Sequence, residues 1–303
     1  MIGEERFTII EQYQALRAGS GYSELVDWTS IRVLGRDRQT FLNNFSTNDI
    51  KQLRPGDSCE AFFTNVKGKI VGYGIVSCRD DELLILGAPG QGARLVEHLD
   101  RYVIREDVTL KDETASRSYW LVNPQNIESD IGRPIAWSPI GDEAYATVEF
   151  PRSEIGKVGG RLTDRGGASV GVEAFTAARI EAGFPLFGVD FDETNLPQEI
   201  ARDRQAISFT KGCYLGQETV ARIDALGHVN QQLVGVQFSG ASVPNGGLEL
   251  SLAGNKVGRV TSAAFSPKVG VPIGLAMVRR EANAVGTRLE SSAGECEVIA
   301  LPV

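Results

Sequence analysis

The spacing of hydrophobic positions predicts a chain in which helices and strands mix at first and strands dominate later. Phe7, Ile10, Tyr13 and Leu16 recur at the spacing of one helix face. Gly19 follows them as a stop signal. The first expected element is therefore a helix that ends before residue 19.

The pattern from residue 20 to residue 125 predicts strands and helices in an order without a repeating unit. Asp37 is the expected N-cap of a helix whose apolar face holds Phe41, Leu42 and Phe45. The other expected elements are strands around residues 33–35, 62–63, 70–76, 83–86 and 119–122, turns at 67–68 and 80–81, and an amphipathic helix over 95–103. Such an order is typical of the α+β class.

Residues 126–171 are rich in glycine, aspartate, serine and proline, and their apolar runs are short. This composition predicts strands and loops. Residues 172–182 then have helical character, and Gly183 and Pro185 follow as the usual stop signals.

A different pattern begins at residue 233. Short apolar runs alternate there with Gly, Asn and Pro turns, at residues 233–238, 248–252, 257–261, 274–278 and 298–301. Alternation of this kind predicts a small antiparallel barrel or sandwich. We expect a domain boundary near residue 232.

Composition and charge narrow the class of protein. A chain of 303 residues is expected to form two or three domains. The net charge of −8 argues against broad binding of nucleic acid or of an anionic membrane. The charged N-terminus, the lack of a long apolar run and four widely separated cysteines favour a cytoplasmic protein with reduced thiols.

Residues 211–218, with the sequence Lys-Gly-Cys-Tyr-Leu-Gly-Gln-Glu, are the densest group of chemically useful side chains. Lys211 lies two residues before Cys213 and is expected to lower the pKa of that thiol. Gly212 and Gly216 permit sharp turns and a close approach by a ligand. The structural alternative is a glycine-rich turn whose cysteine is inert.

This segment resembles the signature of the YgfZ family, the folate-binding, tRNA-modifying relatives of the glycine-cleavage T-protein. Four further blocks are similar to that superfamily in order and spacing. They are Phe41-Leu42 with residues 46–50, the hairpin 65–70, residues 179–190 (Arg-x-Glu-Ala-Gly followed by Gly-x-Asp), and residues 258–267 (Gly-x-Val-Thr-Ser followed by Ser-Pro).

The resemblance implies an α+β, three-domain cloverleaf around a central channel, with a small C-terminal antiparallel β-barrel. The expected domains are residues 1–50 with 116–232, an inserted lobe at 51–115, and a barrel at 233–303. The resemblance also implies a tetrahydrofolate-binding accessory protein, with iron–sulfur enzymes or assembly proteins as partners, including enzymes that modify tRNA. Cys213 and Lys211 are then the expected functional pair.

One departure bears on catalysis. The aminomethyltransferases carry an acidic pair just after the 65–70 hairpin, and those positions hold Gly72 and Tyr73 here. No carboxylate is available there to handle the proton of a folate intermediate. We therefore expect the fold and the folate pocket without classical aminomethyltransferase activity.

A folate pocket needs a carboxylate for the pterin, flat walls for its ring and cations for its glutamate tail. The candidates are Glu181, Glu199 and Glu218 for the pterin, Tyr73 and Tyr214 for the walls, Arg222 or Lys211 for the tail, and Gln217 and Asn65 as further contacts. For each of them a surface charge, or a turn in the case of Asn65, is the alternative.

Other functions stay open. A folate-dependent one-carbon transferase would place its acid elsewhere, for example at Glu60 or Asp49. A thiol enzyme would pair Cys213 with His228 as its base. An interaction module would use the 211–218 loop for docking. The chain has no Cys-x-x-Cys and no His pair at ligand spacing, so we expect no metal or iron–sulfur cluster of its own.

Overall fold

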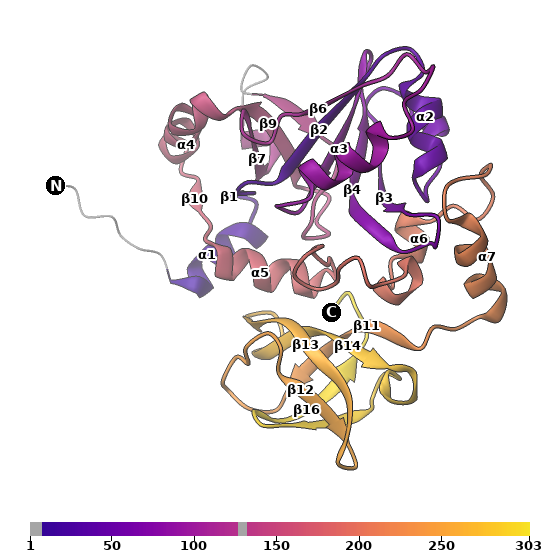
Figure 1. The fold of residues 1–303 in the computed structure, drawn as a ribbon. Helices are drawn as coiled ribbons and strands as arrows, with labels where there is room; N and C mark the ends of the chain where they lie inside the picture. Colours follow the sequence, from indigo (N-terminus) through magenta and orange to yellow (C-terminus); the bar gives the residue numbers. More distant parts are fainter. Residues whose placement is uncertain (1–7, 127–131) are drawn as a thin grey trace.

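The structure is a computed structural model that describes residues 8–126 and 132–303. Two five-stranded sheets form the larger, upper part of the molecule in Figure 1, and a closed barrel lies below them. The helical segments α1 (Ile9–Arg17) and α5 (Val172–Glu181) run between these two parts.

Helix α1 begins at a capping box. Thr8 accepts a hydrogen bond from the backbone N–H of Glu11, and the Glu11 carboxylate accepts from the backbone of Thr8. Two N–H groups at the helix start are thereby satisfied. The first predicted helix is confirmed, with Tyr13 and Leu16 buried, while Phe7 lies outside the described residues.

The first sheet has the order β10 (Ala168–Ser169), β1 (Gly21–Glu24), β7 (Arg117–Val122), β9 (Ala146–Pro151) and β8 (Arg133–Ile135). One of its faces is covered by α4 (Ile155–Asp164), whose Val158 and Leu162 pack against Trp120. The prediction of only strands and loops over 126–171 is wrong at α4. Its Gly156, Gly159 and Gly160 hide the apolar period, since glycine is a poor helix former in isolation.

The second sheet has the order β3 (Ser58–Thr64), β4 (Ile70–Cys78), β5 (Glu82–Gly87), β2 (Thr29–Leu34) and β6 (Thr109–Asp112). Its outer face is covered by α2 (Arg38–Phe45) and α3 (Gly92–Asp100), which bury Phe41, Leu42, Leu95 and Leu99. These predicted strands and both helices are confirmed, although the Asp37 side chain makes no capping bond.

The predicted division at residues 50 and 51 falls inside this second sheet. Strand β2 pairs with both β5 and β6, so the sheet runs from residue 29 to residue 112. Such pairing between distant strands leaves no local signal in the sequence. The division of the chain into domains stays a prediction.

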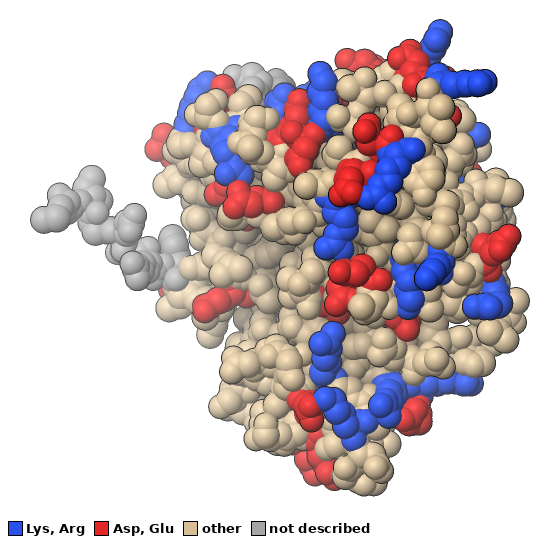
Figure 2. Space-filling view, in the orientation of Figure 1, with Lys and Arg blue, Asp and Glu red and all other residues tan. Residues whose placement is uncertain are grey.

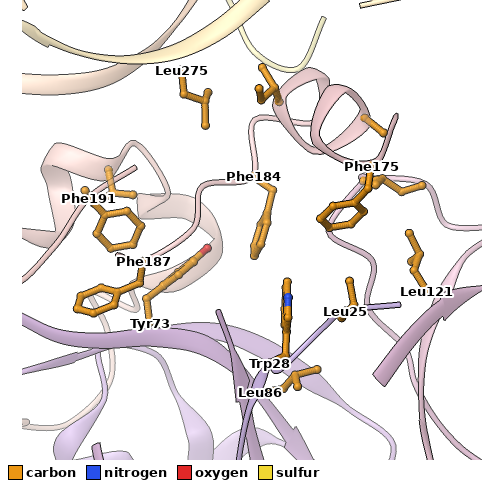
Figure 3. Packing of buried hydrophobic residues seen from close by; sticks show 14 of the residues in the cluster. Leu25, Trp28, Tyr73, Leu86, Leu121, Phe175, Phe184, Phe187, Phe191 and Leu275 are labelled. Carbon is orange, nitrogen blue, oxygen red and sulfur yellow. The ribbon is translucent and has the colours of Figure 1, made fainter. Parts of the chain in front are cut away.

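The inner faces of both sheets share one hydrophobic cluster with α5 and with the segment that follows it. Its centre is aromatic: Figure 3 shows Trp28, Tyr73, Phe184, Phe187 and Phe191 turned toward one another. The ring centroids of Tyr73 and Phe191 are 5.6 Å apart and those of Tyr73 and Phe184 are 6.0 Å apart. These spacings are those of tilted and edge-to-face aromatic pairs.

The chain between α5 and the barrel contains three short helical segments joined by loops, namely η4 (Pro197–Ile200), α6 (Asp203–Ala206) and α7 (Gln217–Leu226). The remaining single turns are η1 (Ile50–Gln52), η2 (Pro124–Asn126), η3 (Arg152–Glu154) and η5 (Arg280–Ala282).

The C-terminal domain is a closed barrel, which decides between the two predicted architectures. Its order is β11 (Gln231–Phe238), β14 (Val271–Arg279), β13 (Asn255–Ser266), β12 (Glu249–Leu252), β15 (Arg288–Ser291) and β16 (Gly294–Ile299), with β16 paired back to β11. Strand β15 was not predicted, because its four residues include only one apolar side chain, Leu289. In the part of the chain that the structure describes, no helix is long and apolar enough to cross a membrane.

Candidate functional site

Lys211 is buried, and its ammonium group is enclosed by backbone carbonyl oxygens. Its Nζ donates to the carbonyls of Asn43, Ser46 and Asn48 at 2.6, 2.7 and 2.7 Å. These oxygens lie at and just beyond the C-terminal end of α2, where helix carbonyls lack internal donors and a positive charge is favoured. Lys211 therefore acts as a C-terminal cap for a helix that is distant in the sequence.

Burial lowers the pKa of Lys211 to about 8, against the opposing attraction of Asp49 and Cys59. The aromatic ring of Tyr214 lies 5.0 Å from Nζ and adds a cation–π contact. Tyr214 is itself buried, so its ring is enclosed by protein and is not a free wall for a ligand.

Residues 215 and 216 of the loop contact the end of α2 and the hairpin between β3 and β4. Leu215 donates its N–H to the carbonyl of Asn44 at 2.9 Å and accepts from the Thr64 hydroxyl at 2.6 Å. Gly216 adopts a φ of 84°, and a Cβ there would lie 2.5 Å from the Asn65 carbonyl oxygen. Only glycine fits this contact. Gly216 thus shapes the loop where it meets the hairpin.

Cys213 and Gly212 are exposed, whereas Lys211 between its carbonyls is not. The three hydrogen bonds of the Lys211 ammonium account for its three donors. Activation of the Cys213 thiol by Lys211 stays a prediction. What the structure assigns to Lys211 is the position of the loop that carries Cys213.

The pairing of Cys213 with His228 is wrong. Cys213 precedes the first turn of α7, and His228 follows its last residue. A ten-residue helix is about 15 Å long, which is beyond hydrogen-bond reach. The Nδ1 atom of His228 instead lies 3.0 Å from the carbonyl oxygen of Leu226.

Glu181, a predicted pterin partner, joins α1 to the barrel. Its carboxylate accepts from Tyr13 Oη at 2.7 Å and from Arg17 Nη2 at 2.5 Å, and it also accepts from the hydroxyl of Ser266 on β13. Both of its oxygens are occupied and only 2% of the residue is exposed. Glu181 therefore serves as an internal clamp.

A second buried clamp lies close by along the chain. Arg179 on α5 donates to Asp190 at 3.0 Å, and Asp190 accepts from Thr261 and Ser262 on β13 at 2.8 and 2.6 Å. The blocks at residues 179–190 and 258–267 that carried the resemblance thus meet in space. Their polar residues hold the barrel against α5.

Glu199 is buried too, but it keeps one free acceptor. Its Oε2 accepts from Asn195 Nδ2 at 2.8 Å, from the N–H of Leu196 at 3.1 Å and from Gln231 Nε2 at 3.4 Å. Its Oε1 makes no hydrogen bond within residues 8–126 and 132–303. Glu199 is thus the buried candidate that can still accept a bond from a ligand.

The remaining predicted contacts lie on the outer part of this region. Gln217 accepts from the N–H of Tyr214 at 3.3 Å, and Asn65 accepts from the N–H groups of Lys67 and Lys69 inside the hairpin turn. Glu218 and Arg222 are exposed on α7. A common folate pocket formed by the predicted contacts stays a prediction.

Tyr73 belongs to a buried polar group that the sequence revealed only in part. Its hydroxyl donates to Glu60 Oε2 at 2.6 Å. Arg202 donates two hydrogen bonds to the same carboxylate. Its Nε donates to Oε2 at 2.9 Å, and its Nη2 donates to Oε1. Burial, with the nearby negative charge of Glu60, raises the pKa of Tyr73 well above its usual value. Arg202 was missed because nothing in its local sequence marks it.

The departure at residues 72 and 73 has a clear geometry. Gly72 faces α3, where an added Cβ would lie 2.7 Å from the Leu95 side chain. Tyr73 faces inward, into the aromatic cluster of Figure 3. The inward position on this strand therefore carries a phenol in place of a carboxylate.

In the parts of the chain that are described, no three His, Cys, Asp or Glu side chains are grouped so that they could hold a metal ion. On the face that Figure 2 shows, basic and acidic side chains are interspersed.

Residues 231–302 match the family described as the glycine cleavage T-protein C-terminal barrel domain. One relative is a chloroplastic protein of Arabidopsis thaliana that carries the name "Putative transferase", which states no substrate. It is 26% identical over 91% of this chain and 69% of its own length. The aminomethyltransferase of Thermoanaerobacter pseudethanolicus is 24% identical over 93% of this chain and 84% of its own. That of Mycobacterium leprae is 24% identical over 97% and 88%.

The crystal structure of the glycine cleavage system aminomethyltransferase T from Bartonella henselae superimposes with a TM-score of 0.85. The superposition covers 97% of this chain and 89% of that one, at 17% identity. The predicted α+β class with a C-terminal β-barrel is therefore confirmed. This chain has the fold of the glycine-cleavage T-protein, and its sequence similarities support the glycine-cleavage T-protein superfamily.

Proposed function

We propose that this protein binds tetrahydrofolate and supports other enzymes, and that it does not transfer aminomethyl groups itself. The observation that carries the proposal is the group formed by Tyr73, Glu60 and Arg202. The inward position that would need a catalytic acid holds Tyr73, and the carboxylate beside it is already bound by Arg202.

The carboxylate of Glu60 is already occupied by its neighbours. Glu60 receives three hydrogen bonds, two of them from the Arg202 guanidinium, so both of its oxygens are engaged. General acid–base catalysis contributes roughly 10²–10⁴-fold to a rate. Loss of such a group is enough to make aminomethyl transfer negligible.

The residues present fit a folate at one point. Glu199 Oε1 is a free acceptor on a carboxylate that is only 6% exposed, which suits an N–H of the pterin. The Tyr73 ring is enclosed by the aromatic cluster and, like that of Tyr214, is not a free wall for a ligand. When bound, the folate supplies a carrier for a one-carbon unit, while Glu199 orients its ring. Glu181 has no free oxygen and is not part of this proposal.

The resemblance to the YgfZ family extends the proposal to its partners. Support of iron–sulfur enzymes, including those that modify tRNA, requires a surface that another protein can reach. Cys213 and Gly212 are exposed on a loop that Lys211 fixes to α2. The 211–218 loop is thus the proposed contact surface, with Cys213 as its reactive group.

A second candidate function is a one-carbon transferase. Glu60 lies beside Tyr73, so release from Arg202 would place an acid at the inward position. Asp49 is a weaker choice, since it lies near the buried Lys211. The transferase function is also supported by the similarity of this chain to proteins that are named aminomethyltransferase.

Two measurements on the intact protein separate these functions. Calorimetric titration with tetrahydrofolate should give binding that weakens about tenfold or more in Glu199→Gln. The matched variant Glu173→Gln, at an exposed position of α5, should bind like the wild type. Turnover of methylene-tetrahydrofolate with an amine donor should be absent. Turnover that disappears in Glu60→Gln would establish the transferase instead, and no heat with tetrahydrofolate would reject both functions.

A further inference from the structure

A cavity lies at the junction of the barrel with the rest of the chain, against residues such as Leu233 and Leu275 of the central hydrophobic cluster. Its volume is about 250 Å³. It is bounded by the end of α5, by the segment from η4 to α6, by β11 and by residues 298–302. Most of its lining is apolar, from residues such as Ile200, Leu233, Leu275 and Leu301.

The polar side chains of this cavity are Arg202, Gln205, Gln232 and Asn283. No carboxylate side chain lines it among the described residues. Asn283 Nδ2 donates to Gln232 Oε1 at 3.4 Å, so the Gln232 amide nitrogen remains as a donor. The polar part of the wall therefore offers N–H donors and contains no carboxylate side chain.

Arg202 belongs to this lining, and its guanidinium is held in a fixed orientation. Glu60 holds its Nε and Nη2, and the Phe184 ring lies 5.9 Å from its guanidinium carbon. Its Nη1 makes no hydrogen bond to any residue that the structure describes, and 14% of the side chain is exposed. A guanidinium held on one side by a carboxylate presents its remaining N–H groups without further loss of rotamer freedom.

The cavity is small for a ligand site. Its volume of about 250 Å³ lies just below the usual range of drug-sized ligand sites, about 300–1,000 Å³. This volume and lining suit a small metabolite with an apolar part and one acceptor group.

We infer that the cavity at Arg202 and Gln232 binds a small monocarboxylate. The carboxylate accepts from Arg202 Nη1 and from the Gln232 amide, and the aliphatic part of the ligand lies against Leu233, Leu275 and Leu301. Glu199, the proposed folate contact, is not among the lining residues of this site. Because Arg202 also holds Glu60, the occupied cavity adjoins the buried polar group at Tyr73.

Saturation-transfer NMR with butyrate at millimolar concentration tests the inference on the full chain. Butyrate should receive saturation from the protein, and butyramide, which has the same shape without the charge, should receive little. Gln232→Glu places a negative charge in the wall, and Arg202→Lys keeps a charge for Glu60 but cannot also reach into the cavity. Each should weaken butyrate binding about tenfold or more.

Gln237→Glu, on the same strand but outside this cavity, is the matched control and should bind butyrate normally. Since Gln232 is only half-buried and glutamate has its shape, Gln232→Glu keeps the test valid if Arg202→Lys fails to fold. Equal transfer to butyrate and butyramide, unchanged binding in Gln232→Glu, or no transfer to butyrate at all would overturn the inference.

Discussion

Lys211 donates a 2.7 Å hydrogen bond to the carbonyl oxygen of Ser46, a residue 165 positions away in the chain. With Asn43 and Asn48 it forms a closed set of three donors and three acceptors. This contact joins residues 46–50 and residues 211–218, two blocks that carry the family resemblance. The contact gives a physical reason why the two blocks occur together. One supplies the carbonyls at a helix end, and the other supplies the charge that satisfies them.

Replacement of Lys211 by methionine should destabilise the protein. Three carbonyls would lose their donor, and a buried group left without its partner costs about 1–3 kcal/mol. We expect a loss of about 3 kcal/mol in the free energy of unfolding, measured by urea denaturation. Lys67→Met in the exposed hairpin turn is the control and should change little. A Lys211→Met midpoint equal to that of the wild type would contradict the role of Lys211 as a cap.

Glu60 and Arg202 should be strongly coupled. Glu60→Gln leaves a buried guanidinium without its counter-charge, and removal of one partner of a buried pair costs about 3–5 kcal/mol. Arg202→Met should have a comparable cost, and the double variant should lose much less than the sum. A double-mutant cycle from urea denaturation measures this coupling. Additive losses would mean that the two side chains do not interact.

Asp203 should make stability depend on pH. Its Oδ1 is buried without a hydrogen-bond partner, and burial, with the nearby Asp224, raises the pKa of Asp203 to about 6. A carboxyl group whose folded pKa is raised stabilises the fold below its unfolded pKa of about 3.9, and this contribution is lost as the pH rises through 6.

Asp203→Asn should therefore raise the free energy of unfolding at pH 7.5 by about 1 kcal/mol, after allowance for the partial exposure of the side chain. Near pH 4 the variant and the wild type should agree. Thermal unfolding at both pH values measures the difference. An equal effect of the substitution at pH 4 and pH 7.5 would show that the charge is not its cause.

The four thiols should react at different rates. Cys213 is exposed, Cys78 and Cys296 are buried, and burial raises the pKa of Cys59 to about 12 and that of Cys296 to about 11. A disulfide reagent at neutral pH should therefore give one fast thiol, since the thiolate is the reactive form. Cys213→Ser should remove the fast phase, and Cys296→Ser should leave it in place.

The same reaction tests the predicted activation of Cys213. If Lys211 activates the thiol, Lys211→Met slows the fast phase without abolishing it. An unchanged rate in a folded Lys211→Met protein would limit Lys211 to its structural role.

Local patterns in the sequence predicted most elements and few of the contacts. Helix α3 was predicted because Leu95 and Leu99 fall on one helix face, and the barrel strands other than β15 were predicted because their apolar runs are separated by turn residues. Helix α4 was not predicted because glycines interrupt the helical spacing of its apolar residues. In each case the success or failure of the prediction depended on whether residues close together in the sequence carry a clear helix or strand spacing.

The site depends on partners far away in the sequence, and no local pattern specifies them. Glu181 has the residue type of a pterin partner, but its donors come from α1 and from the barrel. Arg202 had no motif to mark it, and its importance emerges only from its contact with Glu60, which is 142 residues distant. The loop at 211–218 was singled out for its composition, while the burial of Lys211 could be known only from the fold.

The loop is fixed on both sides of Cys213. Before the cysteine, Lys211 donates to the carbonyls at the end of α2, and after it Leu215 contacts Asn44 and Thr64. A partner protein that reaches this cysteine would therefore meet a surface that is already ordered. Association at a preorganised surface loses little conformational entropy. A short peptide with the sequence of residues 208–218 lacks the α2 carbonyls and the hairpin, so it would be a poor substitute for the folded protein in any such encounter.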